Sequence, residues 1–411
     1  MSNQSQHQLF IPCPRGLEPA LADELRGLGS STLRVLDPVA SGVPARGTLD
    51  DVMRANLHSR LASRVLLLLG AAEAANADDV YRLALKQPWS TWFDASRTIR
   101  VDVTAERSPL ESLHFAALRA KDGVCDHFRL RGQDRPDVDR EHPDVRIHLH
   151  LSATQALVYL DTSGEPLFKR GWRTAHGGAP LKENMAAGVL RLAGWTPQAV
   201  LFDPMCGAGT IAIEAACIAC RVAPGLQRAF GFELLSGFDP EAWRALRAQA
   251  QAARCPPPAA IIAADIDPRM VQLAQENARR AGVEDAIVFR QGDVMDATPP
   301  AVPAPGQAAH VVANPPYSER LEAKGRASDD FLPRLGDVLK QRFTGWNAAL
   351  LLADLQGDRA LRLKPMRRHV VYNGAIECRL FTFSLVAGRP QRRAADAPAL
   401  VNPSAEARSP E

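Results

Sequence analysis

The chain has 411 residues and is 46% hydrophobic, so we expect two or three domains with well-filled cores. No apolar run approaches the roughly 18 residues that a membrane span needs, and residues 1–8 lack the charged start and apolar core of a signal peptide. The formal net charge is only +3, and residues 1–180 hold as many basic as acidic side chains. Composition therefore excludes a membrane protein and a strongly basic nucleic-acid-binding protein.

The seven cysteines are scattered along the chain, which fits the reduced thiols of a cytoplasmic protein. Cys217 and Cys220 form a C-x-x-C pair, but they fall in an alanine-rich predicted helix without a second pair. We expect them to be buried small residues, and we predict no metal site.

The N-terminal region is predicted to contain a small α/β module followed by a second α+β region. The module covers residues 1–55, and its helix over residues 18–28 buries Leu21, Leu25 and Leu28. The second region covers residues 56–165. Its predicted elements are a strand over 99–104, a helix over 113–128, a strand over 145–151 with alternating apolar residues, and a strand over 156–160.

Two groups of basic residues in this half are candidate RNA contacts. The first group is a loop that contains Arg129, Arg131, Arg135 and Arg140, and the second surrounds Trp172 with Lys169, Arg170 and Arg173. Cations beside an aromatic ring suit single-stranded or looped RNA. The same residues could equally be charged side chains of loops that contact only solvent. Both interpretations stay open at this point.

A glycine turn follows the first strand of the C-terminal region. Residues 199–202 form a short apolar run typical of a buried parallel strand, and Asp203 closes it. Gly207 and Gly209 come next, where the chain must turn tightly and let a ligand approach its backbone. Apolar residues then recur at helical spacing over residues 211–218. The order of strand, glycine loop and helix places a ligand at a helix N-terminus.

The same residues match the dinucleotide pattern G-x-G-x-x-A, so a nicotinamide or flavin enzyme is an alternative. That class needs a ribose-binding acid about twenty residues later, at the end of the next strand. Glu233 is near this distance, but its surroundings do not open a second strand–helix unit. Asp203 suits a cationic aminoacyl sulfonium better than a pyrophosphate. We favour S-adenosylmethionine over a dinucleotide, and over a glycine turn without a ligand.

Three further predicted strands deliver polar residues to the same sheet edge. Asp265 ends the strand over 260–265 and can accept both hydroxyls of a ribose, while Asp267 caps the helix that begins at Pro268. A strand over 286–294 carries Asp293, which suits an adenine amino group. The strand over 310–313 delivers Asn314. Ligands of open α/β sheets bind at this edge.

The segment Asn314, Pro315, Pro316, Tyr317 predicts the chemistry. The exocyclic nitrogen of a purine, like an amide nitrogen, is a poor nucleophile because its lone pair is delocalised. The Asn314 side-chain oxygen and the Pro315 carbonyl can bind its two hydrogens, the prolines fix the backbone, and Tyr317 offers a flat face to the ring. A proline-rich turn is the alternative, but the position behind a strand favours transfer of a methyl group to such a nitrogen.

At these motifs the chain resembles class I methyltransferases that carry a THUMP RNA-binding domain. The resemblance rests on residues 203–210, 265–268 and 314–321, and it extends over about residues 9–385. It implies a C-terminal Rossmann-like α/β domain with a seven-stranded doubly wound sheet over residues 166–386. It also implies a ferredoxin-like module over 1–55, a THUMP domain over 56–165, and a tail over 387–411 that we expect to be disordered.

The resemblance also implies a substrate and a set of contacts. Relatives of this kind methylate the N2 atom of a guanine in 23S ribosomal RNA. The segment around Lys182 and Glu183 resembles the part of the family that covers the cofactor. The predicted cofactor contacts are Lys182, Glu183, Asp203, Pro204, Met205, Cys206, Gly207, Gly209, Thr210, Asp265, Asp267, Asp293 and Asn314, and the predicted catalytic residues are Asn314, Pro315, Pro316 and Tyr317. Many family members continue into a second methyltransferase that makes 7-methylguanine, and we expect that activity to be absent here.

Several alternatives remain open. The target could be a guanine of transfer RNA or an adenine N6. A protein methyltransferase acting on a glutamine amide could use the same Asn-Pro-Pro-Tyr segment, although the RNA-type N-terminal half argues against it. A non-catalytic RNA-binding factor with a degenerate fold is the third alternative, and the intact Asp203, Asp265, Asp293 and Asn314 argue against it.

Overall fold

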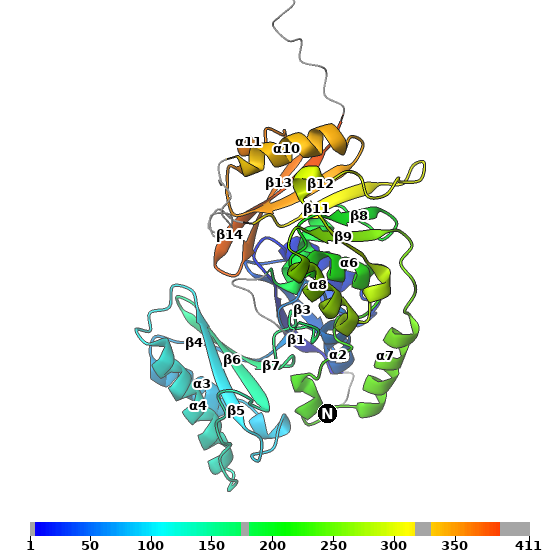
Figure 1. The fold of residues 1–411 in the computed structure, drawn as a ribbon. Helices are drawn as coiled ribbons and strands as arrows, with labels where there is room; N and C mark the ends of the chain where they lie inside the picture. Colours follow the sequence, from blue (N-terminus) through cyan, green and yellow to red (C-terminus); the bar gives the residue numbers. More distant parts are fainter. Residues whose placement is uncertain (1–4, 174–180, 317–329, 387–411) are drawn as a thin grey trace, which may run out of the picture.

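The computed structural model describes residues 5–173, 181–316 and 330–386, and within them the chain forms two seven-stranded sheets (Figure 1). Tyr317 and residues 387–411 lie outside the described part. The first sheet has the order β2-β3-β1-β4-β7-β6-β5. Its strands are β1 (His7–Pro12), β2 (Arg34–Val35), β3 (Gly42–Gly47), β4 (Leu66–Glu73), β5 (Ile99–Ala105), β6 (Val145–Leu151) and β7 (Gln155–Asp161).

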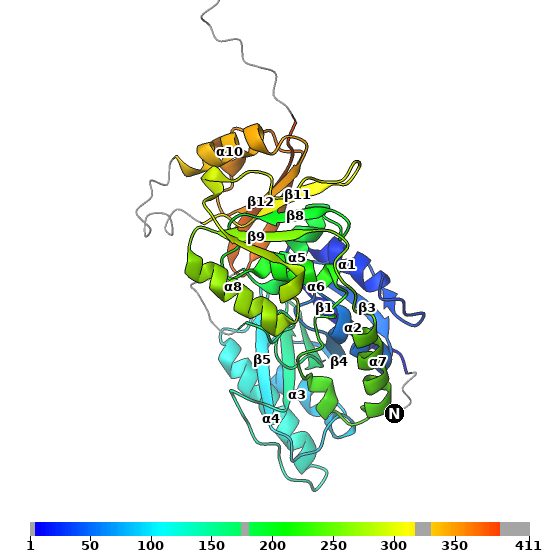
Figure 2. The ribbon, with the colours of Figure 1, turned by 45° about the vertical axis from the view of Figure 1, so that its right-hand side comes forward.

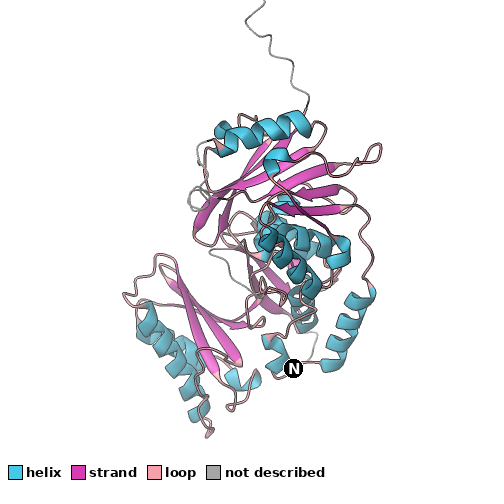
Figure 3. Cartoon of the chain, viewed as in Figure 1, coloured by secondary structure: helices cyan, strands magenta, loops and turns pink. Residues whose placement is uncertain are grey.

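The first sheet is continuous across the predicted ferredoxin-like and THUMP regions. Strand β1 pairs with β3 on one side and with β4 on the other, and β4 then pairs with β7. Only local patterns were available from the sequence, so this long-range pairing was not predicted. The helices of this half are α1 (Glu18–Arg26), α2 (Leu49–His58), α3 (Ala77–Lys86) and α4 (Leu113–Arg129), with a short 3-10 turn at Trp89–Thr91. Helices α3 and α4 lie side by side against the THUMP part of the sheet (Figure 3).

The second sheet has the order β10-β9-β8-β11-β12-β14-β13 and is parallel except for β14. Its strands are β8 (Val200–Asp203), β9 (Ile261–Asp265), β10 (Val288–Gln291), β11 (Ala309–Ala313), β12 (Asn347–Leu352), β13 (Arg367–Asn373) and β14 (Ile376–Ser384). The strand order reverses between β8 and β11, and ligands of open sheets bind outside the strand ends at such a switch point. The predicted seven-stranded doubly wound sheet is confirmed.

Alternate residues of the central strands enter two separate cores. Leu201 belongs to the core that α5 (Glu183–Leu192), α6 (Thr210–Ala219) and α8 (Pro268–Ala281) cover, whereas Phe202 belongs to the core under α10 (Phe331–Arg342). Figure 2 shows α6 and α8 on one side of the sheet and α10 on the other. This alternation follows from the two-residue period of a strand. The remaining elements are α7 (Pro240–Ala252), α11 (Gly357–Ala360) and the 3-10 turns Gly231–Leu234, Glu284–Ala286 and Val294–Asp296.

Two boundaries differ from the sequence prediction. Strand β10 covers Val288–Gln291 rather than residues 286–294, because it is the edge strand and pairs with β9 alone. Asp293 consequently lies beyond the strand, where its side chain accepts a hydrogen bond from Met295 N–H. Helix α1 ends at Arg26, two residues earlier than predicted. None of the helices within the described residues combines the length and apolar character that crossing a bilayer requires.

Candidate active site

The glycine turn joins β8 to α6 as predicted. Gly207 and Gly209 have φ angles of 52° and 84°, in the left-handed region that side chains rarely adopt. A Cβ at Gly209 would lie 2.9 Å from the Cβ of Ala274 on α8, so close helix packing also requires glycine there. A Cβ at Gly207 would meet no described atom within 4 Å. The first glycine therefore borders open space beside the N-terminus of α6, where a ligand can approach the backbone.

Asp203 is a buried carboxyl beside this turn. It is the last residue of β8 and is only 1% exposed. Burial raises the pKa of its side chain to about 8, and the neighbouring carboxylate of Asp265 raises this pKa as well, whereas a 3.4 Å hydrogen bond from Met205 N–H lowers it. Burial disfavours the charged form of this carboxyl. A cationic ligand group beside it would stabilise that charged form and would itself be bound by the carboxylate.

Asp265 ends β9 and holds the glycine turn in place. Its Oδ2 accepts a 2.9 Å hydrogen bond from Gly207 N–H, and its Oδ1 accepts a 3.0 Å bond from Asp267 N–H. Each carboxylate oxygen can accept a second bond, so both oxygens can still receive ribose hydroxyls. Asp267 caps α8 through Arg269 N–H, and Pro268 is the first helical residue, as predicted.

Asn314 follows β11 at the same edge of the sheet. Its Oδ1 atom is buried and has no hydrogen-bond partner among the described residues. Pro315 beside it is buried. A buried amide oxygen without a donor is costly unless a ligand supplies one. This unpaired oxygen is the feature of the fold that most directly indicates where the amino group of a substrate would bind.

One residue that sequence reasoning missed supports the turn from α8. Asn277 is fully buried, and its Nδ2 donates a 3.0 Å hydrogen bond to the carbonyl of Ala208. The available signal was a polar residue beside Ala274 and Ala278 on the apolar face of the helix. Such a residue must find a polar partner inside the fold.

Glu183 and Lys182, predicted to contact the cofactor, stand at the N-terminus of α5. Glu183 is 4% exposed, and its Oε1 lies 2.8 Å from Nε of Arg173. Arg173 also donates to the hydroxyl of Thr210 at 2.8 Å. This chain of contacts ties the segment before α5 to the first residue of α6. Glu183 and Arg173 thus tie α5 to the residue that follows the glycine turn, and the assignment of Lys182 and Glu183 to the cofactor stays a prediction.

Arg170 has to be withdrawn from the predicted RNA contacts. Its side chain is 3% exposed, its Nε lies 3.2 Å from Oε1 of the equally buried Glu214, and its Nη2 donates to the carbonyl of Arg60. Trp172 is 2% exposed, so no aromatic face is offered to RNA there either. Basic residues that are neighbours in the sequence can thus differ in burial, and the sequence alone does not show which of them are exposed. The side chain of Arg173 is bound to Glu183 and Thr210. Lys169, by contrast, is exposed and pairs with Glu165.

Replacement of Arg170 with alanine should lower the free energy of unfolding by roughly 3–5 kcal/mol, because it leaves Glu214 buried without its main partner. The matched variant Lys169→Ala, in an exposed pair, should cost less than about 1 kcal/mol. Urea denaturation of both variants measures the difference. Equal losses in the two variants would show that the buried Arg170–Glu214 pair contributes no more to stability than the exposed Lys169–Glu165 pair.

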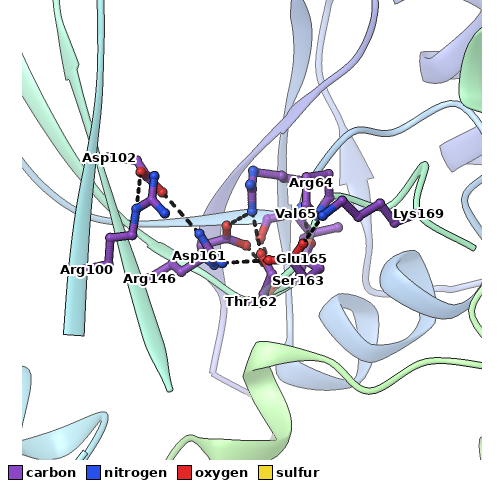
Figure 4. A network of polar contacts seen from close by, with 12 residues as sticks. Arg64, Val65, Arg100, Asp102, Arg146, Asp161, Thr162, Ser163, Glu165 and Lys169 are labelled. Atoms are coloured by element: carbon purple, nitrogen blue, oxygen red, sulfur yellow. Dashed lines mark hydrogen bonds and ion pairs between the residues drawn. The ribbon is translucent and has the colours of Figure 1, made fainter. Parts of the chain in front are cut away.

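The junction between the two halves is a polar network (Figure 4). Arg64 of the linker pairs with the buried Asp161 at the end of β7, and Arg146 bonds to Glu165 at 2.6 Å. From the C-terminal half, Arg228 donates to the carbonyls of residues 163, 165, 166 and 169. This network fixes the first sheet relative to the candidate site, and local sequence patterns gave no sign of it.

The predicted burial of Cys217 and Cys220 is confirmed at the end of α6. Among the described residues, no two cysteines form a disulfide. Within the same residues, no cluster of His, Cys, Asp and Glu could hold a metal ion.

Comparison with known families divides the chain into three matches. Residues 170–382 match the family model described as RMKL-like, methyltransferase domain, which is more than half of the chain. Residues 74–161 match the THUMP domain, and residues 8–66 match the RlmL ferredoxin-like domain.

The curated relatives bear the name ribosomal RNA large subunit methyltransferase K/L. The protein of Methylococcus capsulatus is 40% identical over 92% of this chain and 51% of its own length, and that of Pseudomonas aeruginosa is 40% identical over 91% and 52%. The chain thus spans about half the length of the curated relatives it matches.

Solved structures share the fold over nearly the whole chain. A methylase from Clostridium difficile 630 superposes with a TM-score of 0.82 at 26% identity, covering 95% of this chain and all of that one. The methyltransferase SMU.472, crystallised with SAH, gives a TM-score of 0.81 at 27% identity, covering 94% and 99%.

Proposed function

This chain belongs to the RMKL-like methyltransferase family, and on that premise we propose that it transfers a methyl group from S-adenosylmethionine to the exocyclic N2 of a guanine in 23S ribosomal RNA. The observation that carries the proposal is the unpartnered buried Oδ1 of Asn314 at the end of β11, on the same sheet edge as Asp203 and Asp265. A cytoplasmic location, where such RNA is made, is part of the proposal.

The residues at the edge fit the cofactor. Bound S-adenosylmethionine supplies a methyl group on an electrophilic sulfonium. The buried Asp203 would receive its cationic amino group, Asp265 would accept its ribose hydroxyls, and the open backbone at Gly207 would let it approach α6. A relative crystallised with SAH supports this assignment. The side chain of Asp293 would accept a hydrogen bond from the amino group of the adenine.

The acceptor nitrogen would bind between Asn314 Oδ1 and the Pro315 carbonyl. Both atoms accept hydrogen bonds, so they hold the two hydrogens of an amino group and favour the tetrahedral geometry in which its lone pair is available. Positive charge develops on the nitrogen during transfer, and two fixed acceptors stabilise that charge without reorganisation. No strong base is required, because the nitrogen loses its proton readily once it is charged. A guanine in a duplex would have to leave its stack to reach this edge.

The choice of RNA rests on the THUMP match and on the names of the relatives. Incubation with radiolabelled cofactor and total RNA, ribosomal protein or buffer tests it. We expect label in RNA, with ribosomal RNA labelled above transfer RNA. Label in protein would indicate a glutamine-amide methyltransferase, and label in none of the three would indicate a non-catalytic factor.

The exposed arginines at the last residue of α4 and in the loop that follows it should contribute to RNA affinity. Replacing Arg129, Arg131, Arg135 and Arg140 together with glutamine should weaken binding of ribosomal RNA, and each lost phosphate contact should reduce the salt-dependence slope by roughly 0.7–0.9. Arg244→Gln with Arg269→Gln, at 73% and 85% exposed positions on α7 and α8, is the control. A wild-type slope in the loop variant would move the RNA site elsewhere on the chain.

A further inference from the structure

A polar pocket of about 380 Å³ lies where three parts of the chain meet. The N-terminal module contributes Arg15 and Ser41, the start of α5 contributes Lys182 and Asn184, and the end of β13 contributes Asn373. The candidate site described above uses none of these residues except the predicted contact Lys182.

The pocket lies at the edge of the sheet where the candidate active site is formed. Strand β14 runs antiparallel to β12, and Leu352 at the end of β12 pairs with Arg379. The turn around Gly374 therefore extends past the end of β12 on the edge that carries Asn314. Backbone N–H of Tyr372 donates to the carbonyl of Arg15, which fastens this hairpin to the N-terminal module.

Two of the residues that line the pocket, Asn184 and Asn373, carry a buried amide oxygen without a donor. Asn184 is completely buried, and its Nδ2 donates to Ser63 Oγ at 3.1 Å and to the carbonyl of Leu61 at 3.4 Å. Because a carbonyl can only accept, these bonds fix the orientation of the amide and leave Oδ1 without a donor among the described residues. Asn373 is 9% exposed, and its Oδ1 likewise has no partner there. A ligand that donates hydrogen bonds would satisfy these two oxygens.

The charged residues that line the pocket are both basic. The guanidinium of exposed Arg15 lies 5.1 Å from the ring centroid of Tyr372, and Nζ of Lys182 lies 4.8 Å from that of Phe168. Three acidic groups around the pocket have partners of their own. Glu18 accepts from backbone N–H groups, Glu377 pairs with Arg379, and Glu183 pairs with Arg173. The two cations therefore favour an anionic ligand.

The pocket adjoins a larger hollow on the first sheet. This hollow measures about 660 Å³, shares Ser41 and Ser63 with the pocket, and has the half-buried Phe10 and His148 among its lining residues. Aromatic side chains that keep part of the ring exposed can stack on bases of a single strand. A chain of nucleotides can therefore pass from the sheet into the pocket.

We propose that this pocket binds a nucleotide that neighbours the target in the substrate RNA, and that its base carries an exocyclic amino group, as in adenine or cytosine. The amino group would donate to the orphan oxygens, and the phosphate would bind Arg15 and Lys182. The two hydrogens of the amino group match the two orphan oxygens. Uracil has a single donor on its base, the ring N3–H, so it would leave one buried acceptor unpaired, and an unpaired buried group discriminates strongly between ligands. This inference rests on the proposed RNA substrate.

Kinetics of the full-length chain on ribosomal RNA test the pocket. Arg15→Ala and Asn373→Leu should each raise KM for RNA about tenfold or more, with kcat and cofactor affinity within twofold of wild type. Arg367→Ala, at an exposed position of β13 outside the pocket, is the control and should change neither value. Thermal melting identifies any variant that fails to fold. Unchanged KM in both folded pocket variants, with methyl transfer intact, would overturn the pocket and leave the proposed function standing.

Binding of single nucleotides separates the two proposals. With the cofactor site saturated by S-adenosylhomocysteine, calorimetry or saturation-transfer NMR should show AMP and CMP binding more tightly than UMP by about tenfold, and Asn373→Leu should abolish the preference. This result would support the pocket even if the wild-type chain transferred no methyl group to RNA. Equal affinity for the three nucleotides, or a preference that survives in Asn373→Leu, would overturn the assignment.

Discussion

Replacement of Asn314 with alanine should reduce methyl transfer by at least about 10²–10³-fold while leaving cofactor affinity within twofold. The fold loss is typical for removal of one preorganised group that stabilises developing charge. The Oδ1 atom is buried without a partner in the described structure, so its removal costs no existing hydrogen bond and should not destabilise the fold. Single-turnover kinetics and calorimetry with S-adenosylhomocysteine measure the two quantities.

Asn314→Asp is the informative companion variant. It keeps an acceptor oxygen at the same place, so it should retain more activity than the alanine variant if hydrogen-bond acceptance is the function of the residue. An alanine variant that turns over at the wild-type rate would exclude Asn314 from the mechanism. Parallel loss of cofactor affinity and activity would place the residue in the cofactor site instead.

Asp203→Asn should weaken cofactor binding and stabilise the cofactor-free protein. Loss of a charge-assisted hydrogen bond to a cationic amino group costs roughly 1.5–3 kcal/mol of binding free energy. The same substitution removes a buried carboxyl whose pKa is raised to about 8. We expect a higher melting temperature for the variant near pH 8 and a lower cofactor affinity, a trade-off common at binding sites.

The pH dependence of stability follows from the direction of the pKa shift. In the unfolded chain the pKa of the Asp203 carboxyl is near its ordinary value of 3.8, whereas in the fold burial raises this pKa to about 8. Below both values it is protonated in either state, so folding incurs no penalty from the shift. As pH rises from about 4 to 8 the unfolded state loses its proton first, and wild type loses stability relative to Asp203→Asn. The difference in melting temperature should widen over this range, and a constant difference would contradict the raised pKa.

Cofactor affinity should show the complementary dependence. The cation binds the deprotonated carboxylate, so binding releases a proton and wild-type affinity should rise between pH 6 and 7.5, by up to about tenfold per pH unit. Asp203→Asn should be flat over the same range. Measurements stay below about pH 7.7, where the ligand's own amino group begins to titrate.

The sequence predicts the strand, turn and helix of the site well, because these local structures depend on residues that are close together in the sequence. A buried apolar run, Asp203 and two glycines specify strand, turn and helix, and both glycines adopt the positive φ angles that this requires. Asp267 and Pro268 cap α8 for equally local reasons. The four strand ends follow from the same patterns, although β10 ends before Asp293.

Contacts between distant segments were not predictable in this way. Burial of Arg170 depends on Glu214, which lies 44 residues later, and the single first sheet depends on pairing of β4 with both β1 and β7. Asn184 and Asn373, which carry the orphan oxygens, line one pocket only because the hairpin of β13 and β14 contacts the N-terminal module. Long-range pairing decides which polar residues are buried, and a single sequence does not reveal it.

Identification of the methylated nucleoside tests the central claim most directly. Ribosomal RNA modified by the chain with labelled S-adenosylmethionine would be digested to nucleosides and separated by mass spectrometry, with the Asn314→Ala protein as control. The account predicts label in N2-methylguanosine with the wild-type chain and none with the variant. Label in N6-methyladenosine or 7-methylguanosine, or equal labelling by the variant, would contradict it.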